Sequence, residues 1–448
     1  MASLLSSRYI TSYKATFLLA YPVILSQLGH IMVGVTDTAM VGQVGTIEQA
    51  AVALANSLYT LVLVFGLGVS YGVTPLVAAA DSSGNIAENA ALLKHGIIIN
   101  TILGILLFAL LFCISPVLNL FNQKQEVVDL AIPFLNVMML GMIPLCIFSG
   151  FKQFTEGLSF TRFAMIITIG SNLLNILLNY LMIFGHWGIP KMGLMGSCWA
   201  SFIARVIMAV VMFLYVYYNK HFRKYWVGFS FRNISKELTK KILAIGVPSG
   251  LQWVFEVGAF AFAVIMIGWI SAKAQAAHQV ALSIAATTYM MASGLSAAAS
   301  VRVGNHAGLK DREGVRIAGF SAFVMVLAFM LVCAACFIIF RNALPAIFTQ
   351  DPEVIAIASS LLVIAAFFQL SDGTQVVGLG ALRGVKDVTI PTIITLIAYW
   401  GIGLPMSYVF AFKLNLGSEG IWYGLSLGLT IAAVSLFLRF NYISKKIG

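Results

Sequence analysis

The stretch IIINTILGILLFALLFCI, residues 97–114, decides the class of fold because it runs for 18 residues without a charged side chain. A helix needs about 20 predominantly apolar residues to cross the hydrocarbon core of a bilayer. The same pattern continues along the chain, since 60% of its 448 residues are hydrophobic and only 10% are charged. A soluble domain carries about 25% charged residues. The sequence therefore predicts a protein that crosses a membrane many times.

Twelve apolar stretches are long enough to span a bilayer, and each is expected to be helical because lipid offers no partner to a free backbone amide. The predicted fold class is all-α: a polytopic membrane protein with 12 transmembrane helices. The predicted spans cover approximately residues 15–40, 50–79, 91–118, 130–152, 163–185, 193–218, 241–268, 274–301, 315–340, 354–382, 389–412 and 418–440.

The positions of Lys and Arg predict the orientation of these spans. With a cytoplasmic N-terminus, 21 of the 27 basic residues lie on the cytoplasmic side, five lie on the outer side and one, Arg205, lies within a span. Basic residues collect in the cytoplasmic loops of membrane proteins, so both termini are expected in the cytoplasm. Topology thus accounts for the net charge of +11, and no nucleic-acid partner is expected.

The second half of the chain resembles the first. A single alignment without gaps, which we call the repeat alignment, brings the first two spans onto the seventh and eighth. It pairs identical residues that a merely apolar composition would not supply. Among them are Pro22 with Pro248, Gly42 with Gly268, Gln49 with Gln275, Ser57 with Ser283 and Gly68 with Gly294. Because each half holds an even number of spans, the halves are predicted to be parallel repeats.

The repeat predicts three parts: an N-terminal lobe of six helices at residues 1–225, a cytoplasmic linker at 226–240 and a C-terminal lobe of six helices at 241–448. Two parallel six-helix bundles around a central cleft are typical of transporters. Such proteins bind substrate near the bilayer midplane, between the lobes, and work by alternating access.

Three acidic residues, Asp37, Glu256 and Asp372, fall within spans. An ionised side chain near the bilayer centre costs about 2.5–3.5 kcal/mol on insertion scales, so such residues usually face a cavity. Arg205, the one Lys or Arg within a span, cannot neutralise three acids. The second lobe holds two of the acids, and a pair of carboxylates in a low dielectric shares a proton or binds a cation. These positions are the predicted coupling-ion sites.

Span five carries three amides, Asn172, Asn175 and Asn179, at helical spacing, so they share one face of the helix. Hydrogen bonding between helices is the alternative to a role in a site.

Five motifs together resemble those of the multidrug and toxic compound extrusion (MATE) family, in its NorM-like bacterial branch. The combination is specific although no single motif is, and the resemblance covers essentially the whole chain. The motifs are VGVTDT at 33–38, FEV at 255–257, AAHQVAL at 276–282, SVRVG at 300–304 and SDGTQVV at 371–377, which continues to ALRGVKD at 381–387.

The resemblance implies secondary active export of organic, mainly cationic amphipathic compounds, in exchange for inward H⁺ or Na⁺. The resemblance implies a cation site in the second lobe, with Na⁺ as a candidate ligand, formed by Glu256 and Asp372. It implies a second site in the first lobe, formed by Asp37, Asn175, Asn179 and Ser201. It also places Ser57 and Gln279 in the substrate cavity.

Two positions depart from the family's pattern. Na⁺-coupled members often carry Tyr four residues before the span-ten aspartate, whereas Phe368 here supplies no oxygen ligand. Members with a proton-titrating first lobe have Asp where this chain has Asn179, which leaves Asp37 as the only acid within the spans of that lobe.

Other functions fit the sequence less well. A flippase for lipid-linked saccharides, from the same superfamily, often has additional spans and basic residues in its cavity. An intramembrane aspartyl enzyme would need a Gly-x-Gly-Asp context, which neither Asp37 nor Asp372 has. With no Walker A sequence there is no sign of ATP drive. We expect a monomeric transporter of the bacterial cytoplasmic (inner) membrane that is not an enzyme and has no cofactor besides its coupling ion.

Overall fold

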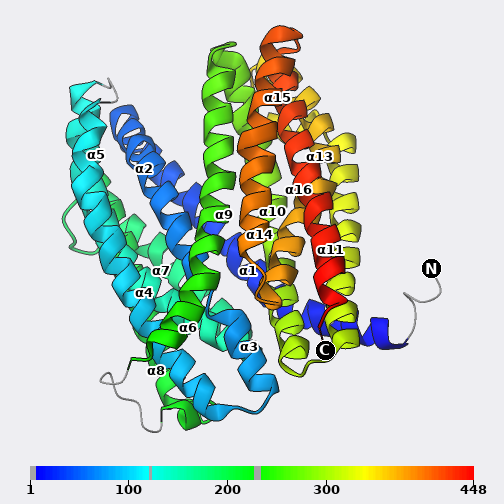
Figure 1. Ribbon diagram of the computed structural model, residues 1–448. Helices are drawn as coiled ribbons and strands as arrows, with labels where there is room; N and C mark the ends of the chain where they lie inside the picture. Colours follow the sequence, from blue (N-terminus) through cyan, green and yellow to red (C-terminus); the bar gives the residue numbers. More distant parts are fainter. Residues whose placement is uncertain (1–6, 121–123, 227–233, 448) are drawn as a thin grey trace. The chain divides into compact units, whose positions relative to one another are not determined.

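A computed structural model describes residues 7–120, 124–226 and 234–447 of the chain (Figure 1). Within these residues the fold is all-α, and 12 helical segments are long and apolar enough to cross a membrane. The prediction of 12 transmembrane helices is therefore confirmed. Of the predicted linker, residues 227–233 lie outside the described residues.

Eight of the twelve spans are single α-helices. Six of them are longer than predicted, because polar first and last turns continue each helix beyond its apolar centre, and the fifth and sixth spans match their predicted bounds to within one residue. The eight helices are α1 (Ser7–Gly42), α7 (Arg162–Phe184), α8 (Leu194–Tyr218), α9 (Lys236–Gly268), α10 (Ala272–Gly308), α11 (Arg312–Ile339), α13 (Pro352–Gly384) and α16 (Gly417–Ser444).

The other four spans are built from more than one segment. Proline marks two of the changes: Pro75 lies in the first turn of α3, and Pro405 lies between two π-helical turns, where its missing N–H removes a backbone hydrogen bond. The segments are α2 (Thr46–Ser70) with α3 (Thr74–Ser82), α4 (Ile86–Ile114) with η2 (Ser115–Leu120), α5 (Gln125–Leu140) with α6 (Met142–Gly157), and α14 (Thr389–Leu396) with η4 (Ile397–Gly403), α15 (Leu404–Tyr408) and η5 (Val409–Lys413). Two short helices, η3 (Arg223–Tyr225) and α12 (Ala343–Ala346), lie outside the spans.

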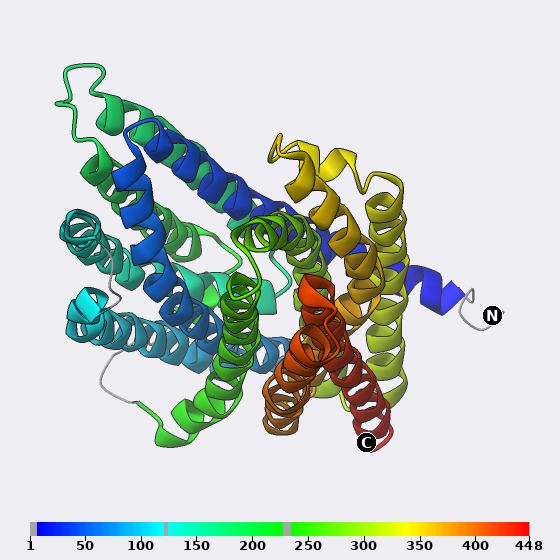
Figure 2. The ribbon, with the colours of Figure 1, turned by 90° about the horizontal axis from the view of Figure 1, so that it is seen from above.

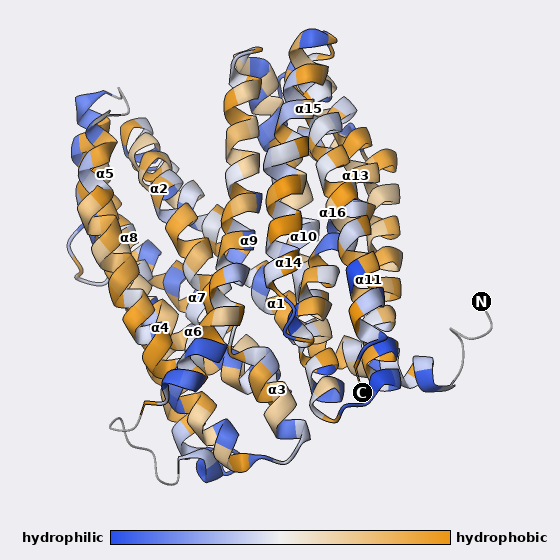
Figure 3. Cartoon of the chain, in the orientation of Figure 1, coloured by the Kyte–Doolittle hydropathy of each residue, from blue (hydrophilic) through white to orange (hydrophobic). Residues whose placement is uncertain are grey.

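The apolar surface of the helices is what a bilayer requires. Figure 3 shows hydrophobic colouring over the long middle parts of the helices and hydrophilic colouring gathered towards their ends. In α4, Leu106 and Phe112 are 60% and 59% exposed, and in α11 Val332 is 64% exposed. Large apolar side chains on outward faces of a soluble protein would attract other chains, but lipid solvates them. The chain is a multi-pass membrane protein.

The chain forms two compact units. The N-unit comprises residues 25–250, and the C-unit comprises residues 1–24 and 251–448. The units divide inside α1 and inside α9, at positions that correspond in the repeat alignment, and not at the polar linker. The N-terminal half of α9 therefore packs in the N-unit, and the N-terminal half of α1 packs in the C-unit.

Two glycine contacts explain where the division falls. In the N-unit, Gly68 of α2 packs so closely on α9 that an added Cβ would lie 2.5 Å from the Cα of Gly250. In the C-unit, Gly294 of α10 packs on α1, where an added Cβ would lie 2.9 Å from the backbone nitrogen of Ile24. The repeat alignment pairs Gly68 with Gly294 and Ile24 with Gly250, so one close helix crossing occurs once in each unit.

The repeat also extends to helix ends. Asn85 caps α4 by accepting from the backbone N–H of Glu88, and Asp311, its counterpart in the repeat alignment, caps α11 by accepting from Gly314. A residue that accepts from the first free N–H groups stabilises the start of a helix. Asp311 lies outside the spans. The backbone N–H of Gly314, and to a smaller extent His306, hold the pKa of the Asp311 carboxyl below its ordinary value.

Within each unit the same helices pair. In the N-unit α6 packs on α4 and on α8, and in the C-unit α13 packs on α11 and on α16 (Figures 1 and 2). The fifth span packs on the sixth in both units, as α7 on α8 and as η4 and α15 on α16. The N-unit thus holds the C-terminal half of α1 with α7 and α8, and the C-unit holds the C-terminal half of α9 with α10, α13 and η4.

Candidate functional site

The first-lobe residues predicted from the sequence form one continuous chain of hydrogen bonds in the N-unit. Asn179 of α7 donates from Nδ2 to Oδ1 of Asp37 in α1 and, at 3.3 Å, to Oδ1 of Asn175. Asn175 in turn donates to Oγ of Ser201 in α8 at 3.1 Å. Both amides and Ser201 are buried, and Asp37 is half-buried. The spacing of four residues brings both amides onto one face of α7, towards α1 and α8.

Arg205 does not neutralise Asp37 by an ion pair within the described residues. Its Nη1 donates to the Tyr59 hydroxyl at 2.6 Å and lies 3.5 Å from the Met138 carbonyl, and its guanidinium lies over the Tyr59 ring. The Arg205 charge still acts on Asp37 electrostatically. Asp37 therefore has an amide as its hydrogen-bond partner and a cation further away, which leaves it able to change protonation or partner.

One buried acceptor among these hydrogen-bonded side chains receives no hydrogen bond. Oδ1 of Asn179 has no hydrogen-bond partner among the described residues. A buried polar atom without a partner costs about 1–3 kcal/mol, and such atoms are typical of functional sites and of positions filled by a water or an ion.

The C-unit brings its two predicted acids together in a buried polar cluster. Glu256 of α9 and Asp372 of α13 are 7% and 3% exposed, and the two carboxylates interact electrostatically. Gln375, one turn after Asp372, donates from Nε2 to Oε2 of Glu256 at 3.3 Å. The Tyr289 hydroxyl of α10 also hydrogen-bonds Glu256. No ion pair to either acid is found within the described ranges.

Span eleven completes the cluster through a π-helical turn. Tyr399 of η4 is fully buried and donates to Oε1 of Gln375 at 2.8 Å. The next residue, Trp400, donates to the Phe255 carbonyl at 2.9 Å, beside Glu256. A π-turn inserts one extra residue into a helix and is frequent at functional sites. Here it coincides with two adjacent side chains that contact α13 and α9.

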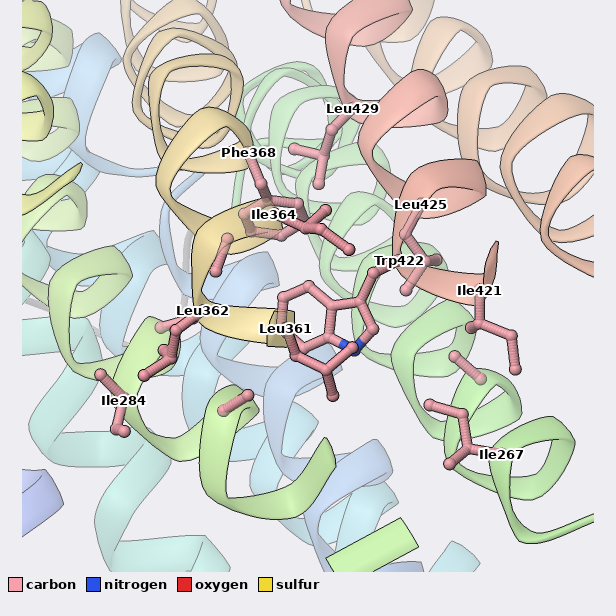
Figure 4. Packing of buried hydrophobic residues seen from close by; sticks show 14 of the residues in the cluster. Ile267, Ile284, Leu361, Leu362, Ile364, Phe368, Ile421, Trp422, Leu425 and Leu429 are labelled. Atoms are coloured by element: carbon pink, nitrogen blue, oxygen red, sulfur yellow. The ribbon is translucent and has the colours of Figure 1, made fainter. Parts of the chain in front are cut away.

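Phe368 lies among apolar and aromatic side chains. Its ring packs on Phe260 and Trp422, at centroid distances of 6.0 Å and 5.8 Å, in an apolar cluster of the C-unit (Figure 4). A hydroxyl oxygen nevertheless reaches the cluster of acids, because Tyr399 brings one from span eleven. The oxygen that Phe368 lacks therefore has a counterpart from a different helix.

The two residues assigned to the substrate cavity lie on separate units. Ser57 of α2 is exposed in the N-unit, and its hydroxyl donates to the Leu54 carbonyl at 2.7 Å. Gln279 of α10 is exposed in the C-unit. Their exposure leaves both side chains able to meet a ligand.

Sequence reasoning missed Tyr289, Tyr399 and Gln375 as members of the site. Gln375 lies in the SDGTQVV motif, three residues after Asp372, so helical spacing could have placed it on the same face. Tyr residues in membrane proteins are enriched at the membrane interfaces, so the presence of the two tyrosines did not indicate a role in the site.

The MatE family model matches the chain twice, over residues 22–181 and 248–409, one match in each repeat. The chain belongs to the MATE family. A probable multidrug resistance protein NorM of Rhizobium meliloti is 32% identical over 442 residues, which cover 98% of this chain and 95% of that protein. A protein of the same name from Pseudomonas putida is 34% identical over 442 residues, with 98% and 96% covered. Among solved structures, a eukaryotic MATE transporter superposes on this chain with a TM-score of 0.88 and a sequence identity of 22%. The match covers 98% of this chain and 99% of that one. This MATE chain thus shares its fold with solved relatives.

Proposed function

We propose that this MATE-family chain exports organic, mainly cationic amphipathic compounds by alternating access, in exchange for H⁺ or Na⁺ that moves inwards. The observation that carries the proposal is the pair Glu256 and Asp372, two buried acids without an ion-pair partner in the described chain. Such a pair is costly in a membrane unless a cation or proton occupies it for part of a cycle. The relatives' names, multidrug resistance proteins, support the class of substrate.

Exchange follows from linkage between the two cations. A proton and a cationic drug favour different charge states of the same acids, and Na⁺ and the drug compete for the same ionised carboxylates. In either case binding of one weakens binding of the other. A gradient of the small cation then drives the drug the other way. Asp37, with its amide partners Asn179 and Asn175, is the corresponding group of the N-unit, and we assign it a change of protonation during the cycle.

We favour H⁺ over Na⁺ as the coupling ion at Glu256. Gln375 directs an N–H at this carboxylate, and an N–H repels a metal cation, which requires oxygen ligands. The groups around the acids, two tyrosine hydroxyls and one amide, can all exchange donor and acceptor roles as a proton arrives or leaves. Export of an anionic lipid-linked sugar would instead favour basic residues, and Arg205 is the one Lys or Arg near the middle of a span.

We further propose that the chain acts as a monomer in the bacterial cytoplasmic membrane with both termini in the cytoplasm, as the distribution of Lys and Arg favours.

The test is dye efflux from proteoliposomes that contain the purified protein. Vesicles are loaded with a cationic dye, and either a pH gradient or a Na⁺ gradient is imposed. Efflux driven by the pH gradient in Na⁺-free buffer is expected. Efflux driven by neither gradient would contradict the proposed function, and efflux driven only by Na⁺ would contradict the choice of the proton.

A further inference from the structure

Gln375 carries a hydrogen bond at both ends of its side-chain amide within the described C-unit cluster. It is fully buried on α13. Its nitrogen donates to Glu256 at 3.3 Å, and its oxygen accepts from the Tyr399 hydroxyl at 2.8 Å. The amide therefore links the coupling acid to the π-helical turn of span eleven.

The direction in which the amide points depends on the charge of Glu256. An ionised carboxylate only accepts hydrogen bonds, so it needs the N–H end of the amide. The Tyr399 hydroxyl donates to the other end and so holds the amide in this direction. The arrangement in the structure is the one that suits ionised Glu256.

A protonated Glu256 requires the opposite arrangement. Its new O–H must donate, and the amide presents an acceptor to it only after turning by about half a revolution about its last bond. The N–H₂ end then faces the Tyr399 oxygen, which can accept, but the hydroxyl hydrogen of this buried tyrosine loses its Gln375 acceptor, so the turned arrangement is the less favourable one. The net chemical change is the transfer of one proton from water to the Glu256 carboxylate, and every other change is a rotation about a bond.

The geometry points to Gln375 and Tyr399 as positioning residues that set the proton affinity of Glu256: the Tyr399 hydroxyl holds the Gln375 amide in the direction that stabilises the ionised carboxylate. This inference rests on the proposed function and names a second group, outside the acid pair, that sets the pH at which coupling occurs. The other titratable groups that act on Glu256 are Tyr289 from α10 and Asp372 from α13, and both remain in place when Tyr399 is changed.

The hydrogen bond from Tyr399 to Gln375 begins in the π-helical turn η4. Tyr399 and Trp400 are adjacent in η4, yet one donates to the Gln375 side chain in α13 and the other to the Phe255 backbone in α9. Trp400 thus fastens the turn to the helix that carries Glu256, and the hydroxyl of Tyr399 is held at a fixed place beside the amide. A hydroxyl held in this way can orient an amide, whereas a mobile one could not.

The test is the pH dependence of binding of the cationic dye rhodamine 6G to purified protein, in wild type and in Tyr399→Phe. Because the dye competes with the proton, affinity rises with pH, and the part of this rise that Glu256 causes has its midpoint where Glu256 releases its proton. Without the hydroxyl, the amide turns freely and the protonated form persists to higher pH. The midpoint should rise by about 0.5–1 pH unit, a three- to tenfold gain in proton affinity, the worth of one hydrogen bond.

Two further variants separate orientation from general packing. Tyr225→Phe removes a hydroxyl from a buried tyrosine of the N-unit, 3.4 Å from Asp81, and should leave the midpoint unchanged. Gln375→Leu removes the amide, so adding Tyr399→Phe to it should shift the midpoint no further, whereas independent effects would add. A folded Tyr399→Phe with the wild-type midpoint, or additive shifts in the double variant, overturns the inference.

A measurement on the wild type covers the case in which Tyr399→Phe does not fold. Infrared difference spectra between about pH 5.5 and 8, with glutamine labelled in its side-chain carbonyl, should show a shifted amide band that is absent in Gln375→Leu. No such band overturns the inference. If wild-type dye affinity does not change with pH at all, the proposed proton coupling fails as well, so the two failures are distinguishable.

Discussion

The N-unit and the C-unit share a scaffold but not a site. Gly68 and Gly294, which the repeat alignment pairs, make the same close helix crossing, and Asn85 and Asp311 cap corresponding helices. The acids do not follow the repeat: in the same alignment Asp37 corresponds to Ala263, and Glu256 corresponds to His30.

This difference separates positions that the packing of the helices constrains from positions that it does not constrain. A glycine at a close crossing is required by the backbone that faces it, so both units need one. An acid in a polar cluster is not required by the packing of the helices. The N-unit has one acid bonded to an amide, and the C-unit has two acids in a cluster with an amide and hydroxyls. The two units should therefore respond differently to loss of an acid, whereas a side chain added at the glycine crossing should destabilise either unit.

The largest effect is expected at Asp372. Asp372→Asn removes one carboxylate of the buried pair, so efflux driven by an ion gradient should fall to the level of empty liposomes. The protein should still fold, because a neutral amide is cheaper than a carboxylate in a buried site. Proteoliposome efflux, with thermal unfolding in detergent as the control, checks this. Wild-type efflux by Asp372→Asn under the same gradient would remove Asp372 from the coupling site.

Asp37→Asn should change the response to pH while leaving dye binding itself in place. The competition between proton and cationic drug at Asp37 would be lost, so drug affinity should lose a dependence of up to about tenfold per pH unit. The measurement is drug affinity between about pH 5.5 and 8, in wild type and variant. A wild-type affinity that stays constant over this range rules out proton–drug competition at Asp37.

The two glycine crossings should differ in how well they tolerate alanine. In Gly68→Ala the new Cβ meets the Gly250 backbone, which cannot move aside, whereas in Gly294→Ala the nearest atom belongs to the Ile24 side chain, at 2.5 Å. Overpacking costs typically about 1–3 kcal/mol, and Gly68→Ala should lie at the upper end and Gly294→Ala at the lower. Thermal unfolding in detergent measures the difference. Equal stability of Gly68→Ala and wild type would contradict the close crossing.

Phe368→Tyr tests whether the apolar cluster limits the choice of ion. A hydroxyl one turn before Asp372 adds an oxygen, the ligand that Na⁺ prefers, so Na⁺-stimulated efflux should increase. The ring must keep its contacts with Phe260 and Trp422, which unfolding temperature monitors. Unchanged Na⁺ stimulation in a folded variant would leave Phe368 without a role in ion choice.

The smallest effects are expected at the two helix caps. Asn85→Ala and Asp311→Ala should each cost about 0.5–2 kcal/mol of stability at neutral pH. Only the cost at Asp311 should depend on pH. Its lowered pKa means that the cap's ionic contribution is present above the ordinary Asp value near 4 and is lost as pH falls through the lower folded value. Unfolding at pH 7 and at pH 3 compares the two, and an equal pH response in both variants would contradict the account.

The sequence predicted most of one site and part of the other, for physical reasons. Asn175 and Asn179 could be placed together because helical spacing puts residues four apart on one face, and Asp37 stood out because a charge in lipid is costly. Tyr399 could not be found this way, because η4 departs from the regular helical period on which such predictions depend. The division of the units inside α1 and α9 depends on close contacts between helices far apart in the chain, which polarity does not reveal.

Proton release on drug binding measures whether one repeated scaffold carries two chemically different ion sites. Rhodamine 6G is added to purified protein in weakly buffered, Na⁺-free solution at near-neutral pH, and a pH indicator reports the protons released per dye bound. We predict release by the wild type, a smaller release by Asp37→Asn and by Glu256→Gln, and a pH dependence of the remaining release that differs between the two variants. The same release from wild type and both variants, or none from any of them, would contradict this prediction.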